Sequence, residues 1–278
     1  MVGNTPFREI GIQLISEKMY NHNIETWSQR KVHSDNTSPL NSLLFSMRLE
    51  DLNWIDIENY LKTDNRLLLV LGACEQHGYL SLATDVKIPL ALADAASQQT
   101  GVLVAPPLNF GASPYFLDYP GTISLRITTL LDVAEDIIHS IYRQGFRRLL
   151  ILNGHGGNDP VRARLAEIID GMVGMQIAWY SWWNADHVTE VAAKHGLKSY
   201  HAAWIEAFPF TRVSELPPGE KQPPKVPGIL GAKSTRQIYG DGVYGGPYSV
   251  NESILDEIFA TALQDIVTLL HFEQKGIP

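Results

Sequence analysis

The sequence predicts an α/β fold, with three α/β/α layers around a mostly parallel central sheet. Between residues 66 and 182, strand-like apolar runs alternate with helical patterns, as in proteins built from βαβ units. The runs at residues 67–71 and 149–152 are apolar at every position, which is typical of parallel strands buried on both faces. Each run ends in a loop that contains histidine and glycine. Because ligands bind beyond the carboxyl ends of such strands, the candidate site is expected there.

Each element rests on its own pattern. Trp54, Ile57 and Leu61 have helical spacing, so a helix is predicted over residues 52–61, with Asp51 as its N-terminal cap. The same reasoning predicts strands at residues 66–71, 102–105, 148–152 and 175–182, and helices at residues 86–98, 128–144, 159–170 and 252–272.

The boundaries of three segments have specific signals. Asp159 is the expected cap of helix 159–170, and Pro160 suits its first turn. Residues 109–123 form a predicted loop, and residues 215–246, rich in proline and glycine, a long ordered loop near the site. Residues 1–45 are weakly patterned, and we expect an extension that packs on the surface or on a neighbouring subunit. Residues 46–278 are then one domain, within the size range of α/β enzymes.

Composition excludes several classes of protein. A formal charge of −8 argues against broad binding to nucleic acids or anionic membranes, which requires a basic surface. A single cysteine, Cys74, rules out an intramolecular disulfide and fits a reducing compartment. The first 20 residues lack a continuous apolar region, so we expect no signal peptide or membrane span. A cytoplasmic protein is predicted.

Three segments carry residues suited to metal chemistry. Glu75, His77 and Asp85 follow the first buried strand, where unpaired carboxylates are costly unless a cation binds them. Taken singly they read as a capping Glu, a hydrogen-bonded His and an Asp that caps the next helix. His155 lies in a glycine-rich loop that is also compatible with a simple strand-to-helix turn.

The third segment contains His201 and Glu206, which reach a common site only if the chain bends there. A surface helix is the equally weighted alternative for this segment. Nearby, Trp182 and Trp183 are most simply core residues of a strand, and as a second role they offer a flat wall for a planar substrate.

Four ordered motifs then suggest a family. They are Glu75-Gln76-His77-Gly78 with Thr84-Asp85, Pro120-Gly121-Thr122-Ile123-Ser124-Leu125, Asn153-Gly154-His155-Gly156-Gly157-Asn158, and His201-Ala202. Together, over residues 52 to the C-terminus, they resemble the creatininase family, creatinine amidohydrolase and its relatives. The resemblance implies a three-layer α/β/α fold and hydrolysis of amide-type bonds. It also implies two divalent ions per chain (zinc, manganese or iron) and a homo-oligomer, since several members form hexamers.

Carried over by motif, the resemblance makes five residues metal ligands: Glu75, His77, Asp85, His155 and Glu206. Asp85 would be shared by both ions, and His201 would be the general acid or base. The ions would activate water and polarise a carbonyl group of a small-molecule substrate.

Several pocket positions depart from the family pattern. Gly157 stands where creatininases carry a glutamate, Tyr115-Phe116 replaces Glu-His, and Trp204 replaces the first glutamate of Glu-x-Glu. We therefore expect a substrate other than creatinine, and we assign Trp182, Trp183, Tyr115 and Trp204 to substrate binding.

Three hypotheses remain open from the sequence. The first is hydrolysis of a C–N bond in an amide, cyclic amide or formamide. The second is metal-dependent ring opening of a cyclic ketone from polyol or sugar breakdown. The third is a non-catalytic binding protein on the same scaffold.

Overall fold

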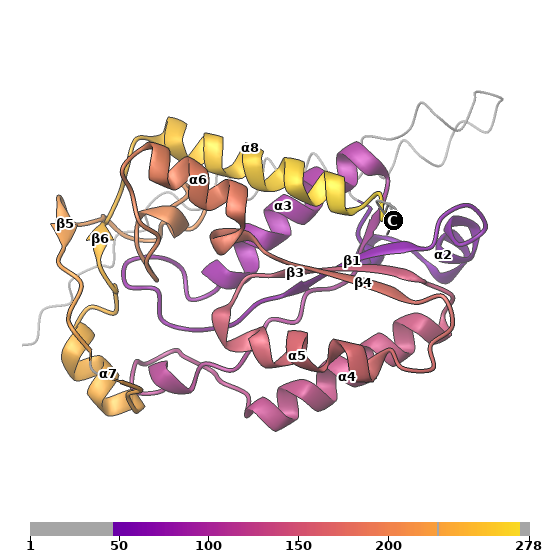
Figure 1. Cartoon of the computed structure of the whole chain (residues 1–278), viewed down its shortest axis with the longest axis horizontal. Coiled ribbons are helices and arrows are strands. Elements are labelled where there is room, and N and C mark those ends of the chain that lie inside the picture. Colours follow the sequence, from indigo (N-terminus) through magenta and orange to yellow (C-terminus); the bar gives the residue numbers. More distant parts are fainter. Residues whose placement is uncertain (1–46, 227, 273–278) are drawn as a thin grey trace, which may run out of the picture. The chain divides into compact units, whose positions relative to one another are not determined.

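The central sheet has four strands, and all of them are parallel. The computed structural model describes residues 47–226 and 228–272, which belong to one compact unit; the predicted extension over residues 1–45 lies outside them. The strands are β1 (Arg66–Leu71), β2 (Leu103–Val104), β3 (Arg148–Asn153) and β4 (Gln176–Ser181), in the order β2-β1-β3-β4 (Figure 1). The parallel sheet with helices on both sides confirms the predicted fold class.

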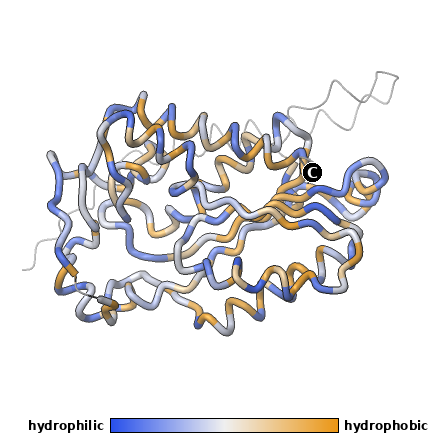
Figure 2. The backbone as a smooth tube through the Cα atoms, in the orientation of Figure 1, coloured by the Kyte–Doolittle hydropathy of each residue, from blue (hydrophilic) through white to orange (hydrophobic). Residues whose placement is uncertain are grey.

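Alternation along β1 produces the two helical layers. Leu68 and Val70 face one core, formed with α3 (Thr84–Thr100), α6 (Asp186–Lys194) and α8 (Glu252–Leu269). Leu67 and Leu69 face the other core, formed with α4 (Ile127–Arg143) and α5 (Asp159–Ile168). Figure 2 shows that the most hydrophobic stretches of the chain lie along these central strands. Both faces of the sheet are therefore buried, which explains why its strands are apolar at every position.

The register of the strands places the candidate loops at one edge. Leu71 pairs with Asn153, and Asn153 pairs with Ser181, so β1, β3 and β4 end level with one another. The loops that follow these strands therefore begin side by side at the carboxyl edge of the sheet.

Two predicted caps are wrong, and so is the alternative in which Asp85 caps a helix. The helix predicted over residues 52–61 is α2 (Trp54–Tyr60), and its cap is Asn53, whose side chain accepts from two backbone N–H groups and forms a capping box with Asp56. Asp85 lies inside the first turn of α3, after Ala83 at the cap position. Asp159 is the first residue of α5 and follows Asn158 at the cap position.

The structure also contains elements that were not predicted. Helix α6 occupies residues that follow β4, and α7 (Ala232–Tyr239) interrupts the loop predicted over residues 215–246. The two-residue strands β5 (Glu220–Lys221) and β6 (Gly246–Pro247) pair antiparallel in that region. Short 3-10 helices are η2 (Leu49–Asp51), η3 (Pro114–Phe116), η4 (Gly156–Asn158), η5 (Trp182–Asn184) and η6 (Trp204–Glu206). None of the helices within the described residues combines the length and apolar character needed to cross a membrane.

Candidate metal centre

Five predicted ligands converge at the carboxyl edge of the sheet. Glu75 and His77 follow β1, Asp85 lies in the first turn of α3, His155 follows β3, and Glu206 ends η6. None of these residues is more than 7% exposed. Ionisable side chains are buried this deeply only when they are paired with one another or bind a cation. The segment from His201 to Glu206 is thus bent into the site, and the alternative of a surface helix is wrong.

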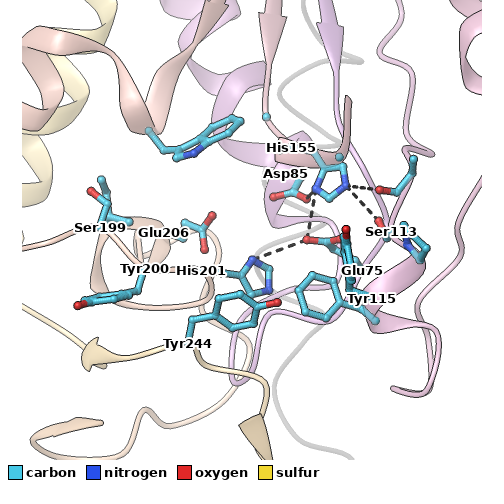
Figure 3. Close-up of a pocket in the computed structure, with 18 of the residues that line it drawn as sticks. Glu75, Asp85, Ser113, Tyr115, His155, Ser199, Tyr200, His201, Glu206 and Tyr244 are labelled. Atoms are coloured by element: carbon cyan, nitrogen blue, oxygen red, sulfur yellow. Dashed lines mark hydrogen bonds and ion pairs between the residues drawn. The ribbon is translucent and has the colours of Figure 1, made fainter. Parts of the chain in front are cut away.

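Three groups of possible ligand atoms lie among the described residues, and two of them share Asp85. Figure 3 shows the group of Glu75, Asp85 and His155. In the first group, Nδ1 of His155 lies 3.3 Å from Oε1 of Glu75 and 3.1 Å from Oδ2 of Asp85. In the second, Nε2 of His77 lies 2.9 Å from Oδ1 of Asp85 and 3.9 Å from Oε1 of Glu206. Each group offers three ligand atoms within 4.8 Å of one another. The two oxygens of Asp85 therefore face different imidazoles, the arrangement expected of a carboxylate that joins two ions.

The chemistry of these atoms fits divalent cations. Oε2 of Glu75 is buried without a hydrogen-bond partner, and the close neighbours of Nε2 of His77 and Oδ2 of Asp85 are other candidate ligands. Buried polar atoms are otherwise almost always satisfied by hydrogen bonds, so these atoms together fit a cation held between them. A set of imidazole and carboxylate ligands suits zinc, manganese or iron.

Backbone carbonyls orient both imidazoles towards the centre. Nδ1 of His77 lies 3.1 Å from the carbonyl oxygen of Glu75, and Nε2 of His155 lies 2.9 Å from that of Ala112. A carbonyl only accepts, so each of these ring nitrogens carries the proton. The opposite nitrogen of each ring is then free to bind a metal, as in most histidine metal sites.

Close packing of the glycine-rich loop explains its composition. A Cβ atom on Gly154 would lie 1.9 Å from the carbonyl oxygen of Asp85, and one on Gly157 would lie 1.9 Å from that of Ala112. A glutamate in place of Gly157 would not fit this backbone. The side-chain nitrogen of Asn158 donates to the carbonyl oxygen of Gly72 and so fixes the loop against the residue that follows β1. This role of Asn158 was not predicted.

Burial and mutual charge perturb the titration of the ligands. Burial alone lowers the pKa of His77, but Asp85 and Glu206 outweigh it and raise this pKa to about 10. Burial also opposes the charged form of His155, yet Glu75 and Asp85 raise its pKa well above the usual value. Burial would raise the pKa of Asp85, but the two imidazoles hold it well below its usual range. Burial raises the pKa of Glu206 to about 7. Without a cation, protons on the imidazoles balance the buried carboxylates.

His201 lies beside the two groups that share Asp85, and with Glu75 and His77 it forms the third group of possible ligands. Its Nδ1 is 3.7 Å from Oε1 of Glu75, and its ring stacks on Phe116 at 4.6 Å and meets Tyr244 edge-on at 5.1 Å. Burial, followed by the charge of His77, lowers the pKa of His201 to about 4. The ring is therefore neutral near pH 7 and is held by aromatic packing with one nitrogen towards the ligands.

A cavity of about 550 Å³ opens onto this centre. Tyr115 and Trp183 line it, as the sequence predicted for substrate-binding residues. Trp182 and Trp204 instead lie in the hydrophobic core, only 2% and 0% exposed, and do not line the cavity, so their assignment to substrate binding is wrong. The indole N–H of Trp204 donates to the carbonyl oxygen of Lys198, which holds the ring in the core. Sequence reasoning missed other lining residues, among them Ser199, Tyr200 and Tyr244, because no motif marks them.

The fold and the site together define an α/β protein with a candidate metal centre at the carboxyl edge of a parallel sheet. The family model for creatinine amidohydrolase, Creatininase, matches residues 50–270, and the chain belongs to the creatininase family.

Curated relatives share part of the sequence. The chain is 35% identical over 152 residues to creatinine amidohydrolase of Pseudomonas putida, covering 50% of this chain and 58% of that protein. It is 29% identical over 102 residues to 3-dehydro-scyllo-inosose hydrolase of Thermotoga maritima, covering 36% of this chain and 33% of that protein. It is 35% identical over 102 residues to the mycofactocin precursor peptide peptidase of Mycolicibacterium smegmatis, covering 33% of this chain and 40% of that protein. The chain thus spans between a third and three-fifths of the length of these relatives.

Solved structures share the fold. A manganese form of creatininase superposes with a TM-score of 0.65 at 24% identity, covering 84% of this chain and 100% of that chain. A Zn–Zn form of a creatininase variant superposes with a TM-score of 0.66 at 23% identity, with the same coverage.

Proposed function

We propose that this protein is a dinuclear metal-dependent hydrolase that cleaves a C–N bond of a small amide, cyclic amide or formamide. The observation that carries the proposal is Asp85, whose two oxygens face two different histidines. Membership of the creatininase family supports it, since creatinine amidohydrolase is a relative.

The residues divide into ligands and a proton carrier. Glu75, Asp85 and His155 would hold one ion, and His77, Asp85 and Glu206 the other. Two divalent ions in such a site lower the pKa of water and polarise a substrate carbonyl. His201, whose Nδ1 is directed towards Glu75, would carry a proton from the attacking water to the leaving nitrogen. The metal would be zinc, manganese or iron; related structures are manganese and zinc forms.

The second candidate function uses the same metal centre but opens the ring of a cyclic ketone instead of cleaving a C–N bond. A relative is named 3-dehydro-scyllo-inosose hydrolase, and attack of water on a carbonyl is common to ring opening of a cyclic ketone. The third candidate, a non-catalytic binding protein, is disfavoured by the complete ligand set. We also propose that the protein forms a homo-oligomer, such as a hexamer, and that it is cytoplasmic. Light scattering after size-exclusion chromatography tests the oligomeric state.

Metal analysis followed by a substrate panel tests the function. The purified chain should hold about two ions, lose activity on chelation and regain it with zinc or manganese. The Asp85→Ala protein should hold no metal; a fully metallated, active Asp85→Ala protein overturns the proposal. A panel of cyclic amides, formamides and cyclic ketones, read by product mass, decides between the first two candidates, and empty sites in a carefully purified protein favour the third.

A further inference from the structure

The wall of the cavity is uncharged. Among the described residues that line it, the acidic side chains are Glu75, Asp85 and Glu206, and all three belong to the candidate metal centre at its floor. No lysine or arginine of the described part of the chain lines the cavity. A carboxylate or phosphate on the part of a substrate remote from the metals would therefore lose its water without gaining a cationic partner, which is costly.

Aromatic rings dominate this wall, and they fall into two sets. Phe116 and Tyr244 pack against His201 and are used to hold it. Tyr115, Trp183 and Tyr200 do not contact His201 in this way and line the remaining space. Figure 3 shows Tyr115 and Tyr200 on opposite sides of the floor formed by Glu75 and His201.

Trp183 borders open space. A Cβ atom added to Gly156 would meet only Cζ2 of Trp183, at 4.0 Å, so there is open space beside this edge of the indole, while the rest of the ring packs against the core and meets Trp182 edge-on. Tyr115 lies at the mouth and is 43% exposed. Uncovered aromatic rings favour planar groups by stacking and cations by interaction with the ring face.

We infer that the substrate is an amide whose part remote from the scissile bond is an uncharged or cationic planar ring, recognised by Trp183, Tyr115 and Tyr200. This inference rests on the proposed function, because it takes the amide group to lie at the metal centre. The cavity volume of about 550 Å³ is within the range that encloses ligands larger than a single five-membered ring.

A matched series of amides tests the inference by binding rather than by turnover. The probes are benzamide, 4-(aminomethyl)benzamide, 4-carboxybenzamide and cyclohexanecarboxamide, titrated calorimetrically into the full chain loaded with zinc. Benzamide and the cationic probe should bind at least about tenfold more tightly than the carboxylate, and benzamide more tightly than cyclohexanecarboxamide. Equal or tighter binding of the carboxylate, or no binding of any probe, overturns the inference.

Variants identify the wall that carries the selectivity. Trp183→Leu should weaken benzamide about tenfold and cyclohexanecarboxamide less, whereas Trp54→Leu, at a tryptophan 72% exposed and outside the cavity, should change neither. Ser199→Arg supplies the missing cation and should improve binding of 4-carboxybenzamide about tenfold. Unchanged selectivity in both cavity variants counts against the inference.

Ammonia release separates this inference from the proposed function. If the probes bind with the expected selectivity and the metal-loaded protein hydrolyses no amide, the proposed function fails and the ligand class stands. If the protein hydrolyses amides and prefers the carboxylate, the function stands and the ligand class fails.

Discussion

The side-chain nitrogen of Gln76 lies 2.9 Å from Nε2 of His201 and donates to the carbonyl oxygen of Gly242 at 3.0 Å. The side-chain oxygen of Gln76, Oε1, accepts from the N–H of Gly78 at 3.0 Å. Because Gly242 contributes an acceptor and Gly78 a donor, the orientation of this buried amide is determined. Gln76 thus connects the ring of His201 to the loop that contains Gly242.

Substitution of Gly242 should disturb this connection. In Gly242→Ala, the new Cβ would lie 1.8 Å from Oε1 of Gln76, at a φ of +91°. We expect turnover of the best panel substrate to fall at least about tenfold while the metal content is kept. Gly219→Ala is the matched control, because Gly219 also has a positive φ (+80°) and has no atom within 4 Å of the added Cβ. Both variants should lose roughly 1 kcal/mol of stability, and equal turnover in the two would refute the role of Gln76.

The two ligand groups should be separable by mutation. Glu206→Gln should remove one ion and leave the ion held by Glu75, Asp85 and His155, whereas Asp85→Asn should remove both. Mass spectrometric metal counts after dialysis give the stoichiometry. Glu58→Gln, at an exposed acid, is the control and should retain two ions. Identical losses in the Glu206 and Asp85 variants would mean that the groups do not bind independently.

The metal-free protein should become less stable as the pH rises from 6.5 to about 10. The pKa of His77 is about 10 when folded and 6.5 as a model group, so its stabilising contribution is complete below pH 6.5 and is lost as the pH approaches 10. The pKa of Glu206 is raised from 4.5 to about 7, so its contribution to stability is also lost as the pH rises, but at lower pH, between 4.5 and about 7. Thermal unfolding of the chelated protein across this range measures the effect. A melting temperature that rises with pH would contradict it, and His77→Gln should flatten the dependence.

Neighbouring glycines should differ sharply in tolerance. In Gly157→Ala the Cβ would lie 1.9 Å from the carbonyl oxygen of Ala112, which accepts from Nε2 of His155. Displacing that carbonyl should weaken metal affinity about 10–100-fold. Gly156→Ala meets only Trp183, at 4.0 Å, and should bind zinc like the original chain. Competition with a chelating dye reports both affinities, and equal values would show that the carbonyl does not orient His155.

Regular elements were predictable where a periodic pattern was strong. Strand β1 begins and ends at the predicted residues, because its five consecutive apolar residues match a strand buried on both faces. Helix α7 was missed because the surrounding prolines and glycines obscure its eight residues. The cap of α2 was misplaced because Asp51 and Asn53 are both good caps, and backbone geometry decides which one reaches the free N–H groups.

The alternation of strand and helix patterns determined the fold class, and the order of motifs determined the family and the five candidate ligands, because these depend on local pattern and residue chemistry. Only the folded chain decided that the two oxygens of Asp85 face different histidines. It also decided that Trp183 lines the cavity while its neighbour Trp182 lies in the core. Such directions depend on strand register and on contacts between segments distant in sequence, which a one-dimensional pattern does not contain.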